Sequence, residues 1–270
     1  LSGKAQVIGV TGSPGAGKST LVNQLAKAYR AMGKTLGIIA VDPSSAITGG
    51  AILGDRIRMR DLTGDPGIFI RSMATRGALG GLARTTGEVI TVLDAIGREV
   101  VIVETVGVGQ DEVDIAKAAH TTVVVGVPGL GDEIQAIKAG VLEIADVFVV
   151  NKADREGSDR LVLELEMMLS MGAHSGWKVP ILKTVAVRAE GIEEVVEAIQ
   201  GHWQYIQTSG KIRDDRLQRA KDELLVALRE EMIKRLLERD SARDKLAEMQ
   251  LALAERKIDP YTAVERILDS

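Results

Sequence analysis

The strongest constraint on the fold is the segment GSPGAGKS at residues 12–19, which fits the pattern G-x-x-x-x-G-K-[ST]. An apolar run at residues 5–10 precedes it, and residues 21–32 carry apolar side chains at helical spacing until Gly33, which suits a helix C-cap. The segment therefore lies between a predicted strand and a predicted helix, the context in which this pattern forms a phosphate-binding loop. The alternative is a glycine-rich turn that matches by chance, and the flanking strand and helix argue against it.

We predict that this loop binds the phosphate groups of a nucleotide. Its glycines let the backbone fold around an anion with the N–H groups pointing inward, and the following helix directs its positive end at the same anion. Lys18 adds a positive charge at the β- and γ-phosphates, and the hydroxyl of Ser19 is placed to bind Mg2+. The predicted contacts are Gly12, Ser13, Pro14, Gly15, Ala16, Gly17, Lys18, Ser19 and Thr20.

The composition narrows the class of protein. With 270 residues, of which 45% are hydrophobic, the chain is long enough for one large α/β domain with an appendage. A net charge of −4 gives no general attraction to nucleic acid, and no apolar run reaches the ~18 residues that span a membrane. The chain has no cysteine and starts without a signal-peptide pattern, so disulfides and thiolate metal sites are excluded. We expect a soluble, cytoplasmic protein with neither a nucleic-acid nor a membrane partner.

Acidic residues follow two more predicted strands. Residues 36–41 form an apolar run that ends at Asp42, and residues 100–103 form another that ends at Glu104. In a doubly wound α/β fold, ligands gather at the carboxyl ends of the strands, where carboxylates can meet Mg2+ or its waters. Asp42 also suits a helix N-cap, so its role stays open, and Asp55 is a further carboxylate candidate. These patterns predict a P-loop NTPase fold, with a mostly parallel central sheet and helices on both faces.

The segment after Glu104 has the chemistry of a switch loop. Gly107 follows the acid by three residues and allows a backbone N–H to approach the γ-phosphate, so that hydrolysis would release the loop. Gln110 is a candidate for positioning the attacking water, although spacing alone does not place it.

A base-recognition motif follows a later predicted strand. Residues 147–150 are apolar and lead into the N-K-x-D sequence that contains Asn151, Lys152 and Asp154. The Asp154 carboxylate can accept hydrogen bonds from the ring N–H and the exocyclic amine of guanine, whereas adenine offers the opposite pattern and would leave it unpaired. Asn151 is expected to tie loops together, and the stem of Lys152 to pack on the ring. The motif therefore predicts selection of guanine.

A second base-contacting loop is predicted after the strand at residues 180–185. Val185 and Ala186 stand where such a loop belongs, ahead of Gly191. The backbone N–H of Ala186 is the expected donor to the base oxygen.

The composition changes at Lys211, because 24 of the 47 residues at positions 211–257 are charged. An apolar stripe at helical spacing predicts an amphipathic helix there, and it consists of Leu217, Leu224, Leu225, Leu228, Met232, Leu236 and Leu237. Two further helices are predicted near residues 242–254 and 260–268. We therefore expect a nucleotide-binding domain at residues 1–210 and a helical appendage at residues 211–270. The stripe either docks on the parent domain or forms the seam of a homodimer, and the sequence leaves both open.

Together these motifs resemble those of a known family, the methylmalonyl-CoA mutase-associated GTPases of the MeaB or ArgK type, within the G3E group of P-loop proteins. The resemblance covers almost the whole chain and rests on the phosphate loop, on residues 41–45, 49–56, 104–110 and 131–138, and on the Asn-Lys-Ala-Asp loop. It also accounts for Glu104, since most GTPases carry Asp there. The family usually has a helical segment ahead of the phosphate loop, whereas this chain begins almost at the first predicted strand.

The resemblance implies several assignments. Mg2+ would be surrounded by Ser19, Asp42, Asp55 and Glu104. Residues 129–140 would form an extra switch that carries Gln135 and Lys138. The family is dimeric through its C-terminal helices. Its members guard adenosylcobalamin-dependent acyl-CoA mutases and use GTP to gate cofactor loading and to help replace damaged cofactor, so such a mutase is the expected partner.

We therefore expect a slow, Mg2+-dependent GTP hydrolase that prefers GTP and GDP to adenine nucleotides. Lys18 and Glu104 are the expected catalytic residues at the phosphates, and Gln110 and Lys138 are candidates to complete the site, because no residue is an obvious general base. A small-molecule kinase is an alternative, since kinases share the phosphate loop, and a metal-delivery GTPase is another. The guanine loop and switch-like segments favour a regulatory GTPase, and the lack of cysteines or clustered histidines disfavours nickel delivery.

Overall fold

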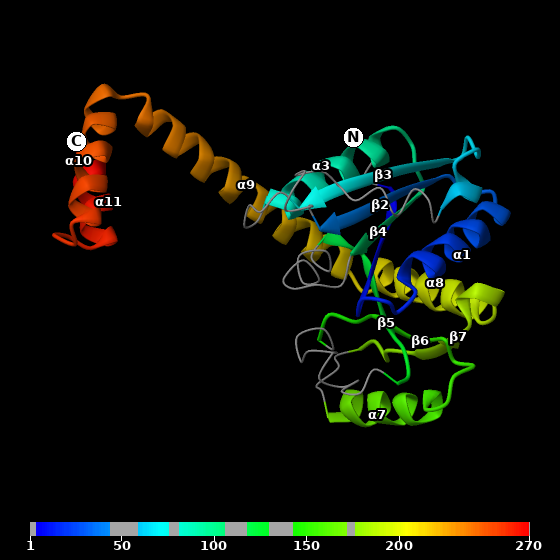
Figure 1. Cartoon of the computed structure of the whole chain (residues 1–270). Coiled ribbons are helices and arrows are strands. Elements are labelled where there is room, and N and C mark those ends of the chain that lie inside the picture. Colours follow the sequence, from blue (N-terminus) through cyan, green and yellow to red (C-terminus); the bar gives the residue numbers. More distant parts are fainter. Residues whose placement is uncertain are drawn as a thin grey trace. The chain divides into compact units, whose positions relative to one another are not determined.

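A computed structural model describes residues 4–43, 59–75, 81–105, 118–129, 143–171 and 176–269. The chain divides into two compact units, Leu1–Gly210 and Lys211–Ser270. The first unit is an α/β layer structure and the second is entirely helical in its described part (Figure 1).

A parallel sheet forms the centre of the first unit (Figure 1). In the described part of the chain its seven strands are β1 (Gln6–Gly12), β2 (Leu36–Pro43), β3 (Ile68–Thr75), β4 (Val100–Thr105), β5 (Thr121–Gly126), β6 (Val147–Asn151) and β7 (Ile181–Thr184). Their order across the sheet is β3-β2-β4-β1-β5-β6-β7, and every pair is parallel. Near-continuous apolar sequences such as VVIVE in β4 suit strands that are buried on both faces, which is why a parallel sheet forms.

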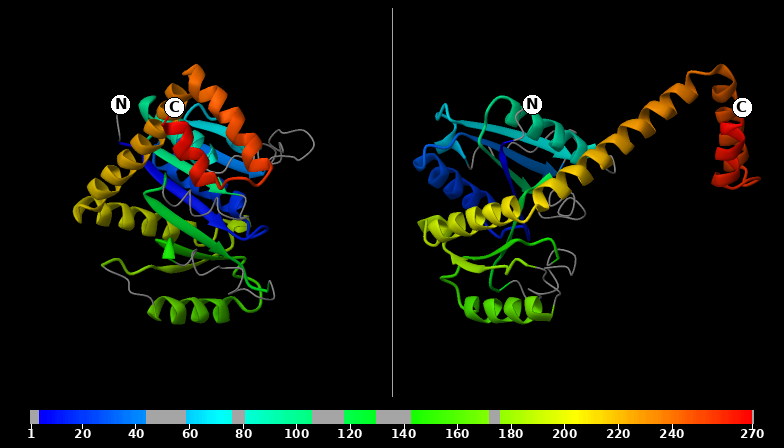
Figure 2. Two further views of the ribbon diagram at one scale, coloured as in Figure 1. Left: turned by 90° about the vertical axis from the view of Figure 1, so that its left-hand side faces the viewer. Right: turned by 180° about the vertical axis from the view of Figure 1, so that it is seen from behind.

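Helices cover both faces of this sheet (Figure 2). The helical elements of the first unit that the structure describes are α1 (Lys18–Ala31), α3 (Gly81–Ala95), α7 (Ser158–Met171), α8 (Ile192–Thr208) and the 3-10 turns η1 (Arg60–Leu62) and η2 (Ala186–Arg188). Helices α1 and α8 pack on one face, where Leu25 and Ile199 join the core with Ile8. Helices α3 and α7 pack on the opposite face, where Leu93 packs with Val7. Alternate side chains of one strand therefore point to opposite faces of the sheet and pack against the helices on each face.

The order of the strands places the topological switch point of the sheet at β1. After β1 the chain builds β2, β3 and β4 on one side of it, and then β5, β6 and β7 on the other. Strand β1 thus has β4 as one neighbour and β5 as the other, so the connections diverge at its carboxyl end. Ligands of open α/β sheets bind at such a switch point, outside the carboxyl ends of the strands.

The predicted fold class is confirmed, and the differences concern element ends. Strand β3 runs from Ile68 to Thr75, because it pairs with β2 over its full length. Helix α1 starts at Lys18, three residues before the apolar spacing begins. Helices α7 and α8 were not among the predicted segments.

The second unit consists of α9 (Lys211–Leu237), α10 (Asp240–Ala254) and α11 (Pro260–Leu268), close to the three predicted helices. Helix α11 starts as its sequence dictates: Asp259 accepts hydrogen bonds from the N–H groups of Tyr261 and Thr262, and Pro260 stands at the first helical position. Helices α10 and α11 pack together and bury Ala242, Met249 and Ala263. No helix in the described part of the chain is long and apolar enough to cross a membrane.

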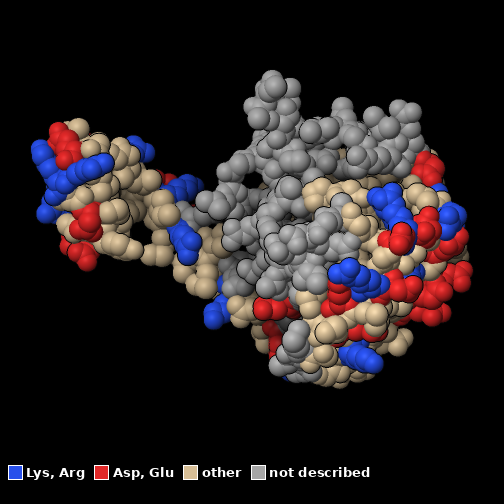
Figure 3. Space-filling view, turned by 60° about the horizontal axis from the view of Figure 1, so that its bottom comes forward, with Lys and Arg blue, Asp and Glu red and all other residues tan. Residues whose placement is uncertain are grey.

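Charged side chains of both signs are interspersed on the surface. Figure 3 shows Lys and Arg interspersed with Asp and Glu over the described part of the first unit on that face. Several of them form ion pairs, such as Arg160 with Glu164 at 2.8 Å on α7 and Arg30 with Asp65 at 2.8 Å. The hydrogen bond from Arg30 and the one from the Gly67 N–H lower the pKa of Asp65.

Candidate functional site

The phosphate loop joins β1 to α1 at the switch point. Gly12 has φ 139°, and a Cβ there would stand 2.1 Å from the carbonyl oxygen of Val125 on the neighbouring strand, so only glycine fits. Gly17 caps α1 in the left-handed region at φ 87°. The N-terminal N–H groups of α1 thus follow directly from the loop, where the helix dipole favours an anion.

Lys18 is buried in the phosphate loop, with 6% of its side chain surface exposed. Its Nζ donates to the carbonyl oxygens of Gly12 at 2.7 Å and Ser13 at 3.0 Å. These two bonds hold the ammonium group over the loop, close to the start of α1. The lysine is therefore positioned as a localised positive charge for phosphate oxygens.

Ser19 and Glu104 meet at the carboxyl edge of the sheet, as predicted for the metal site. The Ser19 Oγ donates to Glu104 Oε1 at 2.6 Å, and both residues are buried. Glu104 reaches this point because β4 pairs with β1 in a register that sets it opposite Val10. A hydroxyl and a carboxylate oxygen side by side are ligands that suit Mg2+.

The structure describes little of the other residues that are predicted to lie near the phosphates and Mg2+. The backbone of Asp42 pairs with Ala74 at the same edge of the sheet, one residue beyond Val41, which pairs with Thr105. Its side chain lies outside the described residues. Asp55, Gly107, Gln110 and Lys138 also lie outside them. Their assignments stay predictions.

Asn151 links the phosphate loop to the loop after β7. Its Nδ2 donates to the carbonyl oxygen of Ala16 at 2.8 Å. Its Oδ1 accepts from Thr184 Oγ1 and from the Ala186 N–H, both at 3.1 Å. The side chain is 2% exposed, so these bonds are shielded from water. One amide therefore holds three segments of the site in register.

Lys152 and Asp154 form the outer part of this region. Lys152 has φ 56°, uncommon for a non-glycine residue, and its Nζ donates to the Gly15 carbonyl oxygen at 2.8 Å. Its stem thus reaches back across the phosphate loop. Asp154 is 42% exposed at its side chain, and its Oδ2 lies 3.4 Å from Nη1 of Arg188. A base bound above Lys152 would meet a carboxylate that is still open to solvent.

The backbone N–H of Ala186 is bonded to the side chain of Asn151. This N–H was predicted to serve the base oxygen, and in the structure it donates to Asn151 Oδ1. Val185 is fixed by a backbone bridge to Glu190. The contact of Val185 and Ala186 with a base stays a prediction.

Four residues of the site were not predicted from the sequence. Thr184 and the buried pair Thr11 and Thr105, whose hydroxyls lie 3.0 Å apart, carry no motif of their own. Arg188 stands two residues after Ala186, and no local pattern identifies it. The signal that would have found Thr184 is parallel register, since it pairs with Asn151.

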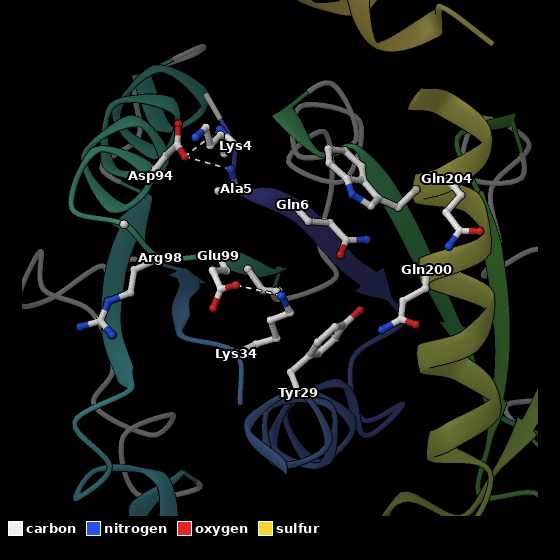
Figure 4. Close-up of a pocket in the computed structure, with 13 residues that line it drawn as sticks. Lys4, Ala5, Gln6, Tyr29, Lys34, Asp94, Arg98, Glu99, Gln200 and Gln204 are labelled. Carbon is white, nitrogen blue, oxygen red and sulfur yellow. Dashed lines mark hydrogen bonds and ion pairs between the residues drawn. The ribbon is translucent and has the colours of Figure 1, made fainter. Parts of the chain in front are cut away.

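A cavity of about 460 Å³ lies at the opposite edge of the sheet, beside the amino ends of β1 and β4 (Figure 4). An ion pair of 2.8 Å between Lys34 and Glu99 stands in its lining. Burial raises the pKa of Tyr29, another lining residue. The strands separate this cavity from the phosphate loop, which lies at their carboxyl ends.

The described geometry thus brings Lys18, Ser19, Glu104, Asn151 and Lys152 to one edge of the sheet. A phosphate loop bonded to an N-K-x-D loop on a parallel sheet is the arrangement of P-loop GTPases, and we assign the chain to that class.

Comparison with known proteins gives the family. The family model described as "Methylmalonyl Co-A mutase-associated GTPase MeaB" matches residues 1–241. The GTPase ArgK of Escherichia coli is 34% identical over 265 residues, which cover 96% of this chain and 80% of that protein. The chain therefore belongs to the MeaB family of GTPases.

Further relatives agree with this. A Pyrococcus abyssi protein described as a candidate GTPase is 48% identical over 272 residues, covering 99% of this chain and 84% of the relative. The mouse protein named methylmalonic aciduria type A homolog, mitochondrial, is 32% identical and covers 97% of this chain, which spans 64% of the mouse protein. A crystal structure titled LAO/AO transport system kinase matches with a TM-score of 0.71 and 27% identity, covering 98% of this chain and 81% of the other.

Proposed function

We propose that this GTPase converts GTP to GDP and phosphate as a chaperone and regulator of an adenosylcobalamin-dependent acyl-CoA mutase of the methylmalonyl-CoA mutase type. In this role it gates cofactor loading and protects or reactivates the mutase. The match of the mutase-associated family model to residues 1–241 supports the partner class. The name of the mouse relative, which refers to methylmalonic aciduria, supports the same class.

The observation that carries the nucleotide part of the proposal is the bridge made by Asn151. Because its amide bonds both Ala16 and Ala186, the phosphate loop and the loop after β7 are held as one site. We assign the phosphates to residues 12–20 and the guanine base to Asp154, with the stem of Lys152 against the ring. Competition between guanine and adenine nucleotides tests this assignment, and equal affinities would contradict it.

We assign Mg2+ to Ser19 and Glu104, completed by Asp42 and Asp55. The buried contact between the Ser19 hydroxyl and the Glu104 carboxylate supports this set, since Mg2+ prefers oxygen ligands. When bound, the ion supplies charge neutralisation at the β- and γ-phosphate oxygens. The ammonium group of Lys18 would also neutralise charge on these phosphate oxygens. Gly107 is assigned to the γ-phosphate, and Gln110 and Lys138 are assigned to the attacking water.

Coupling to the mutase follows from where the sheet strands end. Residues 49–55, 104–110 and 129–140 come at or after the ends of β2, β4 and β5 in the sequence, and we assign them to the surroundings of the γ-phosphate, where a partner that binds them would sense it. GTP and GDP differ by one phosphate, and only groups near it can bind the two states differently. Linkage then requires that a partner preferring one state alters nucleotide affinity reciprocally. Lys138 is the relay residue of this proposal.

The test is a pull-down of the mutase with a non-hydrolysable GTP analogue and, separately, with GDP. Hydrolysis is then measured for the wild type and for Lys138→Ala, with and without the recovered mutase. We expect the mutase to bind one nucleotide state more tightly and to accelerate hydrolysis, and Lys138→Ala to lose the acceleration. If no mutase is recovered in either state, or if its addition leaves the rate unchanged, the chaperone role is wrong while the GTPase assignment stands.

We also propose that residues 211–270 mediate a homodimer. Leu225, Leu228 and Met232 on α9 are 50%, 50% and 60% exposed, so their apolar surface is available to a second copy. The family resemblance points to the same use of the C-terminal helices.

A kinase is the second candidate, because the solved structure that is 27% identical to this chain bears the name LAO/AO transport system kinase. A kinase transfers the γ-phosphoryl group to an acceptor, whereas a GTPase transfers it to water. Incubation with γ-labelled GTP should therefore release free phosphate. Stoichiometric transfer of the label to a small molecule or a protein would support the kinase instead.

A further inference from the structure

The loop that follows β7 is held rigidly by its own backbone. Val185 and Glu190 form an antiparallel bridge, and the Arg188 N–H donates to the Val185 carbonyl oxygen at 2.8 Å. Ala189 closes the turn at φ 58°, in the left-handed region. The loop is anchored to the site at Ala186, whose N–H donates to Asn151. The side chain of Arg188 therefore starts from a fixed backbone position.

The guanidinium of Arg188 is held by a carboxylate on each side. Its Nε donates to Glu190 Oε1 at 2.7 Å and its Nη2 to Glu190 Oε2 at 3.3 Å. Its Nη1 donates to Asp154 Oδ2 at 3.4 Å. The bidentate bond to Glu190 fixes the plane of the guanidinium and raises the pKa of Arg188. Glu190 thus aims the remaining nitrogen at Asp154.

We propose that Arg188, held by Glu190, is a positioning residue that orients the Asp154 carboxylate for guanine and strengthens discrimination for the exocyclic amine of the base. This inference rests on the proposed assignment of Asp154 to guanine. Guanine offers two parallel donors, its ring N–H and its exocyclic amine, and a carboxylate meets both only when its plane lies along them. By binding Oδ2 from the side of the loop, Arg188 restricts rotation of that plane.

Because this cluster is exposed, an effect of Arg188 on the orientation of Asp154 can be measured apart from an effect on the stability of the fold. The side chains of Arg188, Asp154 and Glu190 are 51%, 42% and 56% exposed. Ion pairs this exposed contribute little to the stability of a fold. Loss of Arg188 should therefore leave unfolding unchanged and act on base recognition.

The test compares GDP with inosine diphosphate, which lacks the exocyclic amine, in titrations of the wild type and Arg188→Ala. We expect GDP affinity to fall roughly 5-fold, as for one weakened hydrogen bond, while affinity for inosine diphosphate falls about 2-fold or less. The ratio of the two affinities therefore drops. An unchanged ratio, or tighter GDP binding in Arg188→Ala, would overturn the proposal, since the latter means that Arg188 competes with the base.

Matched variants sharpen this result. Arg155→Ala removes an exposed arginine next to Asp154 in the sequence, and should leave both affinities unchanged; a drop in the ratio there would mean that net charge alone acts. Glu190→Gln should lower the ratio in the same direction as Arg188→Ala, because Arg188 then loses its bidentate partner. Arg188→Lys keeps the charge without the fork and should fail to restore the ratio.

Asp154→Asn tests the underlying assignment separately. If this variant keeps its guanine preference, the assignment of Asp154 is wrong and the inference about Arg188 is overturned with it. If it gains xanthosine nucleotides while Arg188→Ala leaves the affinity ratio unchanged, only the inference about Arg188 is wrong. In the Asp154→Asn background, Arg188→Ala should have no further effect on the ratio, and an undiminished effect there would contradict a role through Asp154.

Discussion

The nucleotide site and the C-terminal helices use their side chains in opposite ways. At the site, polar groups from distant parts of the chain are buried and bonded to each other, as in Ser19 with Glu104 and Asn151 with Ala16. In α9, large apolar side chains such as Leu225 and Leu228 stand half exposed. A substitution at the site leaves a buried partner unsatisfied, whereas one on α9 changes only what that surface can bind. The two regions should therefore respond differently to substitution.

Lys18→Ala should have the largest effect. On the proposed assignment it removes charge-assisted contacts to the β- and γ-phosphates, each contributing about 1.5–3 kcal/mol, so affinity for GTP should weaken on the order of 100-fold or more. Calorimetric titration with a non-hydrolysable GTP analogue, which carries both phosphates, measures this. Lys27→Ala, an exposed lysine of the same helix that pairs with Asp61, is the control and should bind normally. Wild-type affinity and turnover in Lys18→Ala would discard the assignment.

Asp154→Asn should have the second-largest effect on nucleotide binding. The amide cannot accept from both donors of guanine, so GTP and GDP affinity should fall by about 1.5–3 kcal/mol, and xanthosine nucleotides should gain in return. Competition between GDP and xanthosine diphosphate measures the exchange. Unfolding should stay unchanged because this carboxylate is exposed. A uniform loss of affinity for both bases would point to a folding defect instead.

Asn151→Ala should lower both the affinity for nucleotide and the thermal stability of the protein. The substitution leaves the buried Ala16 carbonyl and the Ala186 N–H without their partner, at a cost of about 1–3 kcal/mol for each. We expect Tm to fall by at least about 4 °C and nucleotide affinity to fall about 10-fold. Thermal unfolding with and without GDP measures both. An unchanged Tm would show that the bridge is dispensable.

A paired substitution on α9, Leu225→Glu with Leu228→Glu, should have the smallest effect on the site. Exposed positions usually change stability by about 0.5 kcal/mol or less, so Tm and GDP affinity should stay at wild-type values. If the α9 leucines face a second copy, the variant should become monomeric in light scattering. Lys221→Glu on the same helix is the charge control. A monomeric wild type would contradict the homodimer.

Much of this fold could be predicted because its signals are local. The pattern at residues 12–19 sits between a strand and a helix, and both form at the expected places. The apolar runs became the parallel strands, since strands covered on both faces have no polar alternation. The last residues of β3 are fixed by pairing with β2 and not by their own propensity.

The sequence by itself determined which chemistry the chain carries. The glycines, Lys18 and the N-K-x-D residues are contiguous, and their spacing specifies a local backbone shape and a local set of donors and acceptors. It could not determine which distant groups meet. Ser19 and Glu104 are 85 positions apart, and their contact depends on the pairing of β1 with β4.

The tertiary structure alone decided the contacts of Asn151, Thr184 and Arg188. Asn151 and Thr184 are neighbours because β6 and β7 pair in one register, and a shift by one residue would turn their side chains to opposite faces. Arg188 reaches Asp154 only because the turn from Val185 to Glu190 closes beside the end of β6. Register and strand order result from packing of the whole core, so no local pattern contains them.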